Sequence, residues 1–425
     1  MCSHDDPSDT NDERAGEWPG EWETMDLAPE YILSHLTDAH CHPTDLSHDP
    51  GVYDGVALGG LASMATVPED QGKVAELGSS RPWEGGSLRG KQSGRGPRVV
   101  SCFGYHPWFT HRYTLLPQSP GKEAHYNAVF FPQTGAADTA RRKREKEVLG
   151  ALIRHLPEPI PFGPILNRMR RDVVSAKEQG RLVMVGEVGL DGAARVLWPV
   201  SARGLYDEAT RGLRLEGTPA ENNDEWKRLT PLKISMQHQR AILTAQMELA
   251  IELAVPVSLH CVAAAGPTLD VLVHLRDTYG TRFTNSVNVD LHSAGGWSPA
   301  FWTSASKNLS NLYASPSIYI TSRTRSAPDL IRAIPTDRML VESDTHDVRL
   351  STRLVWGAVD WIARCKRWEV ESDLTPDWGE DGVVLSEDEW WRTGSSVDAE
   401  EGRVWAVRTL ERNWARFMGL IQPYE

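Results

Sequence analysis

The sequence predicts an α/β protein built as a (β/α)8 TIM barrel with several surface insertions. Eight short apolar runs recur along the chain, each bounded by turn residues and each about as long as a buried strand. Most are continuous rather than alternating, which is typical of parallel strands covered on both faces, and helix-like segments separate several of them. An open, doubly wound sheet would give the same alternation. The runs span residues 31–40, 56–67, 98–106, 181–190, 254–261, 285–293, 314–320 and 338–344.

The clearest helix is predicted over residues 235–257, which read "SMQHQRAILTAQMELAIELAVPV". Apolar side chains recur there at three- to four-residue spacing, and the segment ends at a strand that a proline precedes. The apolar positions are Ile242, Leu243, Met247, Leu249, Ala250 and Leu253. A helix here, between the fourth and fifth strands, fits the barrel.

The chain outside these elements divides into an arm and insertions. Residues 1–30 are acidic and polar and predict a flexible N-terminal arm, while 31–425 predict a single barrel domain. Insertions are expected near 69–97, 112–140, 193–230 and 369–401. The last of these is acidic and contains Trp378, Trp390 and Trp391, so it is either a locally packed loop or a contact surface for a protein partner.

Composition excludes several classes of protein. With 425 residues, 40% hydrophobic and 24% charged, the chain is typical of a globular enzyme, and its net charge of −13 argues against sequence-blind gripping of nucleic acid. Five scattered cysteines favour a reducing, intracellular compartment, cytoplasmic or nuclear. The N-terminus lacks a secretory or transit pattern. The chain contains no run of about 20 apolar residues, so no membrane span is expected.

Polar side chains collect at the ends of the predicted strands. Because the carboxyl ends of barrel strands converge on one face, we expect these side chains to share a site. A lone histidine at a strand end is more often structural, but several at the same end of successive strands favour a functional centre. They are His40, His42, His106, Glu187, Asp191, His260, His292, Glu342 and Asp344.

Their chemistry predicts a metal site. Imidazole with carboxylate suits Zn²⁺, Mn²⁺ or Fe²⁺ better than a Ca²⁺ cage of oxygens. His40 and His42 lie on the same face of a strand, since side chains alternate with period two, so both can reach one ion. Cys41 then points away as a small buried filler.

Short motifs in the same order resemble the TatD-like metal-dependent hydrolases, in a form with long insertions like the fungal branch. "TDAHCH" is similar to the family's Asp-x-His-x-His, "FGYHPW" to its Gly-x-His-Pro-Trp, and "VGEVGLD" to its Gly-Glu-x-Gly-Leu-Asp. "PVSLH", "VDLHSAGG", "DRMLVESD" and "NWARFMGL" match later family patterns. The matches run from about residue 33 to 420.

The resemblance implies a TIM barrel with two divalent cations, Zn²⁺, Mg²⁺ or Mn²⁺. It assigns one ion to His40, His42, Glu187 and Asp344, and the other to Glu187, His260 and His292. The cations would lower the pKa of a bound water, and Asp344 would act as general base in the hydrolysis of a phosphodiester. The substrate that the resemblance implies is DNA, and the activity it implies is that of a deoxyribonuclease such as a 3′→5′ exonuclease. Substrate contacts or support of the ligands are expected from Asp38, His106, Asp191, Glu342 and His346.

Some positions depart from the family pattern. Val262 stands where an Arg is common, "SAGG" replaces a loop with Phe, and "DTHDV" replaces a small residue followed by Pro-Tyr. These positions belong to substrate contacts, so the departures put nuclease specificity in question while the ligand set is complete. Two alternatives stay open: hydrolysis of another ester or amide on the same barrel, and a non-catalytic scaffold for protein interaction.

Overall fold

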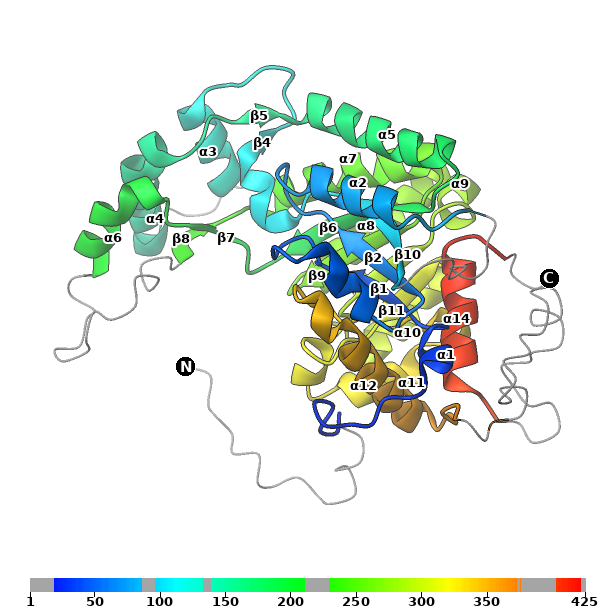
Figure 1. Ribbon diagram of the computed structural model, residues 1–425. Helices are drawn as coiled ribbons and strands as arrows, with labels where there is room; N and C mark the ends of the chain where they lie inside the picture. The colour runs from blue at the N-terminus through cyan, green and yellow to red at the C-terminus, as the bar shows by residue number, and fades with distance from the viewer. Residues whose placement is uncertain are drawn as a thin grey trace, which may run out of the picture.

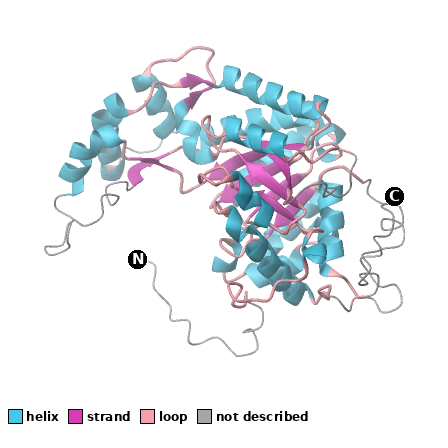
Figure 2. Cartoon of the chain, in the orientation of Figure 1, coloured by secondary structure: helices cyan, strands magenta, loops and turns pink. Residues whose placement is uncertain are grey.

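Seven parallel strands form a sheet that curls into the predicted barrel (Figures 1 and 2). This computed structural model describes residues 19–85, 96–132, 139–210, 229–372, 375 and 403–421. The strands are ordered β1-β2-β3-β6-β9-β10-β11. Most of their side chains are buried, as expected for strands covered by helices outside and packed side chains inside. Their bounds are β1 Thr37–Cys41, β2 Gly60–Met64, β3 Arg98–Phe103, β6 Val183–Asp191, β9 Val257–Val262, β10 Val289–His292 and β11 Leu312–Ser315.

The eighth predicted strand is an extended segment, residues 339–345, that closes the barrel between β11 and β1. On one side, the Leu340 N–H donates to the Ala314 carbonyl at 2.9 Å. On the other side, the Ala39 N–H donates to the Val341 carbonyl at 3.0 Å, and the Asp344 N–H to the His40 carbonyl at 3.0 Å. The segment bonds to both neighbours, so the (β/α)8 prediction is confirmed, with seven regular strands and this segment forming the described barrel.

Helices cover the outside of the barrel. The predicted helix at 235–257 is α7, Met236–Leu253; the Ser235 side chain caps it by accepting from the His238 N–H, and Ala254 ends it in the left-handed region. The other covering helices are α1 Glu30–Leu33, α2 Gln71–Ser80, α5 Phe162–Glu178, α8 Ala265–Tyr279, α9 Thr281–Thr284, α10 Pro299–Asn308, α11 Ala327–Ala333 and α12 Val348–Lys366. Short 3₁₀ helices are η3 Pro50–Gly55, η4 Pro107–Arg112, η5 Ile153–His155, η6 Val200–Ala202, η7 Thr321–Arg323 and η8 Thr336–Arg338. Within the described ranges, no helix has the length and apolar character needed to cross a bilayer.

The amino end of the barrel is closed by α14, Ala406–Phe417. Trp414 and Phe417 pack into a buried cluster with side chains from β1, β2, β3, β6 and β11. The Asn288 amide, just before β10, donates to the Phe417 carbonyl at 2.8 Å. With one end filled in this way, the opposite, carboxyl end is left for a site.

Two of the expected insertions, 112–140 and 193–230, contribute to a lobe beside the carboxyl end of the barrel, at the upper left in Figure 1. It contains β4 Tyr113–Thr114, α3 Lys122–Phe130, α4 Ala140–Leu152, β5 Ile160–Pro161, β7 Arg195–Leu197, α6 Arg203–Thr210 and β8 Leu229–Lys233. The lobe has a separate apolar core, in which Tyr126 of α3 and Leu149 of α4 are clustered with Val196 of β7 and Leu232 of β8. The lobe therefore depends on contacts between distant parts of the chain.

Three expectations need comment. Residues 71–80 of the segment at 69–97 form α2, which packs against β3 as part of the outer helical layer. The run at 314–320 is strand only to Ser315; β11 starts earlier, at Leu312, and turns follow it. Most of the arm at 1–30 and most of the acidic segment at 369–401, with its three Trp residues, lie outside the described residues.

Candidate metal centre

The side chains predicted as ligands meet at the carboxyl end of the barrel. His40 is in β1 and His42 directly follows it, Glu187 is in β6, His260 is in β9, His292 ends β10, and Asp344 lies in the closing segment. All are buried except His260 and Asp344, which are partly buried. The fold thus gathers residues from one end of the sequence to the other around a single point.

Glu187 lies at the middle of this group, and its two carboxylate oxygens face different histidines. Oε2 is 3.7 Å from His40 Nε2 and 3.5 Å from His42 Nε2. Oε1 is 2.7 Å from His260 Nδ1 and 2.9 Å from His292 Nε2. His106 Nε2 also approaches Oε1, at 3.3 Å. This division matches a carboxylate shared between two sets of donors.

Glycines allow the backbone around Glu187 to approach its neighbours. A Cβ on Gly104, at the end of β3, would lie 2.6 Å from the Gly186 carbonyl carbon. A Cβ on Gly189 would lie 2.1 Å from the His260 carbonyl oxygen. Any side chain at either position would push apart strands that carry donors to the centre.

Asp344 faces the same side as His40 and His42. Its Oδ1 is 3.6 Å from His42 Nε2 and 3.8 Å from His40 Nε2. The residue has a positive φ of 53°, a conformation that Asp tolerates better than most residues. The backbone bond from its N–H to the His40 carbonyl holds it there.

A surrounding layer of polar groups orients these side chains. Ser258 Oγ lies 2.7 Å from His40 Nδ1; a bond donated by Nδ1 leaves the Nε2 lone pair facing Glu187. Asp38 does not reach an imidazole but accepts from the Ser343 N–H at 2.9 Å and the His40 N–H at 3.3 Å, which fixes the backbone beside Asp344. Asp191 Oδ2 lies 3.4 Å from His260 Nε2 and accepts from the Trp108 indole N–H.

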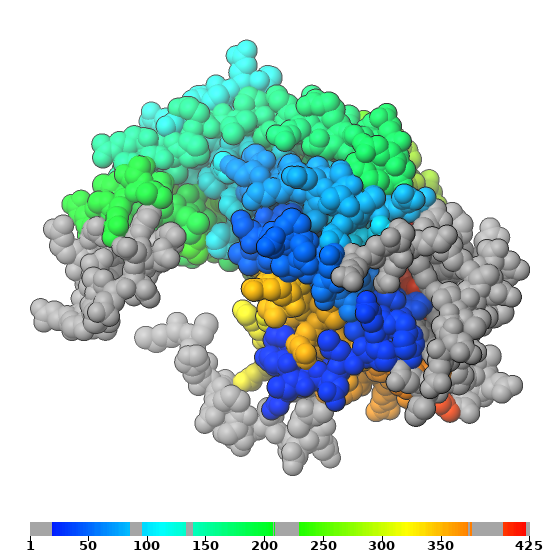
Figure 3. Space-filling view, viewed as in Figure 1, coloured from blue at the N-terminus to red at the C-terminus, as the bar shows by residue number. Residues whose placement is uncertain are grey.

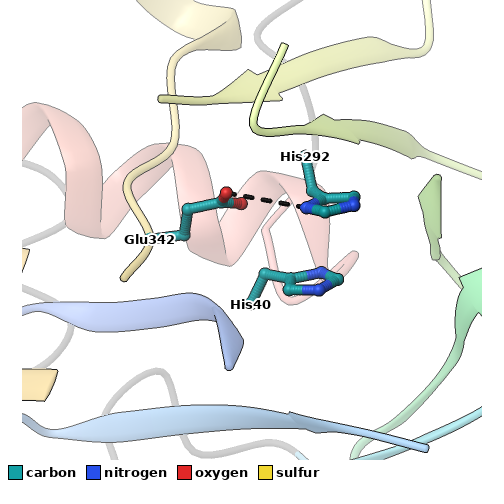
Figure 4. Close-up of side chains that lie close together, drawn as sticks. All are labelled: His40, His292 and Glu342. Carbon is teal, nitrogen blue, oxygen red and sulfur yellow. Dashed lines mark ion pairs between the residues drawn. The ribbon is translucent and has the colours of Figure 1, made fainter. Parts of the chain in front are cut away.

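Glu342 lies beside His292, and a dashed line joins the two side chains in Figure 4. Its Oε1 is 3.7 Å from His292 Nδ1. The Ser293 N–H donates to this oxygen at 2.9 Å. Ser315 Oγ is 2.5 Å from Glu342 Oε2 and 2.7 Å from Asp290 Oδ2, yet a hydroxyl has one hydrogen to donate, so one of these carboxyls carries a proton. Burial agrees with this, since it raises the pKa of Glu342 to about 7 and that of Asp290 to about 8.

The charges of the centre are strongly coupled. Burial opposes ionisation of Glu187, but the surrounding histidines hold its pKa well below its usual value. Burial would likewise raise the pKa of Asp344, but the hydrogen bond with His42 and the nearby imidazoles lower it to about 2. Burial and the charge of His292 lower the pKa of His40 to about 3, whereas for His42 the pull of Asp344 and Glu187 outweighs burial and raises the pKa to about 9. The carboxylates therefore favour the protonated form of some of the surrounding histidines, such as His42, but not of His40.

The donor set fits divalent cations. Nitrogen faces nitrogen at 3.2 Å between His40 Nε2 and His42 Nε2, and at 3.1 Å between His260 Nδ1 and His292 Nε2. Such pairs need a proton or a cation between them, and two ionised carboxylates supply the matching negative charge. Among the described residues, three groups have donor atoms within 4.8 Å of one another: His40, His42 and Glu187; His106, Glu187 and His260; and His40, His292 and Glu342.

Two other predicted residues lie near the ligands. His106 Nε2 is 3.3 Å from Glu187 Oε1, beside the donor set, and its contact with a substrate stays a prediction. His346 lies at the rim with its side chain 61% exposed; its ring stacks on His42 at 5.2 Å and its Nδ1 is 2.8 Å from Asp45 Oδ2. The sequence did not predict the roles of Ser258, Ser293, Ser315 and Trp108. Serine hydroxyls are common near strands, so they carry little signal. Trp108 is part of the "FGYHPW" motif, which was its one signal.

A closed parallel barrel with a histidine and carboxylate cluster at its carboxyl end defines a metal-dependent hydrolase of the TIM-barrel class. The chain belongs to the TatD related DNase family, whose model matches residues 37–372. The resemblance seen in the motifs is thereby confirmed.

Two curated relatives match most of the chain. It is 27% identical to the Cut9-interacting protein scn1 of Schizosaccharomyces pombe, over 81% of this chain and 96% of the relative. It is 25% identical to a Saccharomyces cerevisiae protein described as an uncharacterized deoxyribonuclease, over 73% of this chain and 84% of the relative. Among solved structures, it is similar to a TatD family hydrolase of Entamoeba histolytica, with a TM-score of 0.46 and 10% identity over 91% of this chain and 98% of the other. A TatD homologue of Escherichia coli K12 gives a TM-score of 0.43 and 12% identity over 91% and 99%.

Proposed function

We propose that this protein is a phosphodiesterase with two divalent cations that acts on DNA. The observation that carries the proposal is the division at Glu187, whose Oε2 faces His40 and His42 while Oε1 faces His260 and His292. A carboxylate so placed can join two cations. The Saccharomyces cerevisiae relative and the family are both described as deoxyribonucleases, which supports DNA as the substrate.

In this proposal the cations, when bound, supply a water of lowered pKa and neutralise charge that grows on the phosphoryl oxygens. His40, His42, Glu187 and Asp344 would hold one, and Glu187, His260 and His292 the other. Asp344 accepts the proton of the attacking water, because its carboxylate faces the same side of the centre as His40 and His42 and the nearby imidazoles keep it ionised. Asp191 and Ser258 hold the rings of His260 and His40 in place.

The test counts metal and measures cleavage in the same preparations. Wild type should bind two equivalents of Zn²⁺ or Mn²⁺ by elemental analysis and release nucleotides from labelled single-stranded DNA, with loss of release in EDTA. Glu187→Gln keeps the side-chain shape but removes the charge, so it should lower both metal content and release; Glu178→Gln, on the exposed end of α5, is the matched control. Metal bound by wild type without cleavage of any phosphodiester would leave hydrolysis of another ester or amide.

A second candidate function is a scaffold for a protein partner, favoured by the name of the Schizosaccharomyces pombe relative, which records an interaction with Cut9. The acidic segment at 369–401 is the contact surface in this proposal. Affinity purification from cells would compare wild type with Glu187→Gln and with a Trp390→Ala, Trp391→Ala double variant. Equal recovery of a partner by wild type and Glu187→Gln, with loss in the double variant, supports the scaffold.

We also infer an intracellular location, cytoplasmic or nuclear. Four of the five cysteines lie in described parts of the chain and are buried, and three of them, Cys41, Cys102 and Cys261, are free thiols. Free thiols fit a reducing compartment. Microscopy of the tagged chain tests this inference, and a signal confined to secretory compartments would contradict it.

A further inference from the structure

A groove of about 790 Å³ begins one residue beyond His42. One wall is the segment after β1, from Pro43 to Asp54, and the other is formed by α2 and the start of β3. These segments belong to the lighter blue surface near the centre of Figure 3, above the dark blue of the chain before β1. No predicted metal ligand lines the groove, so it is distinct from the centre that it adjoins.

The groove is basic relative to the rest of the chain. Its described lining has three cationic side chains, Lys73, Arg81 and Arg98, against the carboxylates of Asp54 and Glu76, whereas the whole chain has a net charge of −13. Arg81 pairs with Asp54 at 2.7 Å. Lys73 forms no ion pair with any described residue, and its Nζ is 3.5 Å from the Thr44 carbonyl oxygen, near the end of the groove beside the centre. An ammonium group in this position suits a phosphate.

His346 lies where the groove meets the centre. The contact with Asp45 fixes its ring, one face of the ring stacks on His42 with an interplanar angle of 26°, and the side chain is 61% exposed. Its carbonyl oxygen is 3.4 Å from Nε2 of His48, which lines the groove. The result is a flat ring, held in place, with surface open to solvent between the predicted ligands and the basic groove.

We propose that this groove holds the single-stranded part of the substrate next to the phosphodiester that is cleaved, with a nucleobase stacked on His346 and a backbone phosphate at Lys73. The proposal rests on the proposed function and adds where the strand lies. A ring platform combined with a cationic groove is the arrangement by which proteins hold single strands without reading their sequence. His346 stands in "DTHDV", where this chain departs from the family pattern, so the platform would be a feature of this chain rather than of the family pattern.

The experiment compares a labelled oligothymidylate of about 12 nucleotides with bis(p-nitrophenyl) phosphate, which has no nucleobase and no flanking phosphate. His346→Ala should lower the ratio of kcat/KM for the oligonucleotide to that for the small diester by about 5- to 100-fold, and His346→Phe should restore most of it, because a base can stack on either ring. Lys73→Gln should raise KM for the oligonucleotide and reduce the slope of log affinity against log salt by about 0.7. Lys307→Gln, exposed on α10, is the control.

The outcomes separate this proposal from the proposed function. An equal loss on both substrates in His346→Ala would place His346 in the chemistry and overturn the platform, as would rescue by Asn but not by Phe. Anisotropy of the labelled oligonucleotide in EDTA gives a readout without turnover. If wild type hydrolyses neither substrate but binds the strand through His346 and Lys73, the groove is supported and the proposed function fails; if binding is unchanged in both variants, the groove is overturned.

Discussion

The ring of His40, which faces Glu187, is fixed by a second polar group, Ser258. The Ser258 hydroxyl is fully buried and lies 2.7 Å from His40 Nδ1. We expect Ser258→Ala to weaken metal binding by about 10- to 100-fold, because the ring can then rotate and exchange tautomers. Titration of the metal-free protein with Zn²⁺ measures this effect, and Ser304→Ala, exposed on α10, is the control. Unchanged affinity in Ser258→Ala would mean that packing alone holds His40.

The role of the Asp344 side chain in turnover should be separable from the role of its backbone in the fold. The carboxylate faces the centre, while the backbone N–H bonds to the neighbouring strand and helps to close the barrel. Asp344→Asn keeps the backbone bond to His40 but cannot accept a proton, so we expect kcat to fall by about 10²- to 10⁴-fold. With metal removed from both proteins, the Tm should stay close to that of wild type. Cleavage kinetics and thermal unfolding measure the two effects. Asp337→Asn, exposed in η8, controls for the loss of one charge, and wild-type turnover in Asp344→Asn would contradict the base assignment.

At this scale the sequence predicted donors but not their supports. Alternation along one strand placed His40 and His42 on the same side, and the structure brings their Nε2 atoms to 3.2 Å. The partners of Glu342 were not predictable, because Ser293 and Ser315 reach it from two other strands whose register no local pattern reveals. Buried hydroxyls are common in strands of every function, so their residue type carries little information.

Among the secondary-structure elements, η4, α3 and α7 join the lobe to the barrel through three histidines, of which His111 and His125 are buried and His238 is partly buried. His111 Nδ1 donates to the Trp108 carbonyl, His125 Nε2 to the His111 carbonyl and His238 Nε2 to the Thr110 carbonyl. A carbonyl only accepts, so each ring is held with a hydrogen on that nitrogen. Burial lowers the pKa of all three, that of His111 to about 3. The junction is therefore built for neutral imidazole.

Acid should weaken this junction. The unfolded chain binds a proton at His111 below about pH 6.5, but the folded chain does not until about pH 3, so stability is present above pH 6.5 and is lost as the pH falls. The loss from His111 alone is about 2 kcal/mol by pH 5. Urea unfolding at pH 7.5 and 5 should show a smaller drop in His111→Gln than in wild type, with exposed His274→Gln as control. Equal drops in all three proteins would show that His111 does not contribute.

Element prediction succeeded where a pattern is local. The apolar spacing in α7 and its boundaries at Ser235 and Ala254 follow from neighbouring residues. The lobe was read only as surface insertions, because its core is made by Tyr126 and Leu149 against Val196 and Leu232, and no short window contains both halves. The sequence predicts one insertion at 69–97, because its many glycines and serines are typical of loops, whereas residues 71–80 form the helix α2.

For the whole molecule, the centre and the fold are one thermodynamic unit. The predicted ligands run from His40 to Asp344 and come from β1, β6, β9, β10 and the closing segment of one barrel. The closing segment bonds to β1 through the Asp344 N–H and the His40 carbonyl. The unfolded chain cannot gather these groups, so cations that bind the centre bind the folded state alone. Loss of the barrel and loss of the site should therefore occur together.

Metal should consequently raise the stability of the entire chain, and above its Kd the gain should grow with the logarithm of the metal concentration. At 100 times its Kd, a cation that binds only the folded state adds about 2.7 kcal/mol to the free energy of unfolding. Scans of the metal-free protein with increasing Zn²⁺ or Mn²⁺ should show a rising Tm, reversed by EDTA. Glu187→Gln should abolish most of the rise, because Glu187 faces both sets of histidines, whereas Glu178→Gln should leave it intact. A rise of equal size in Glu187→Gln would mean that the cations stabilise the chain from somewhere else, and the site at the rim would lose its thermodynamic support.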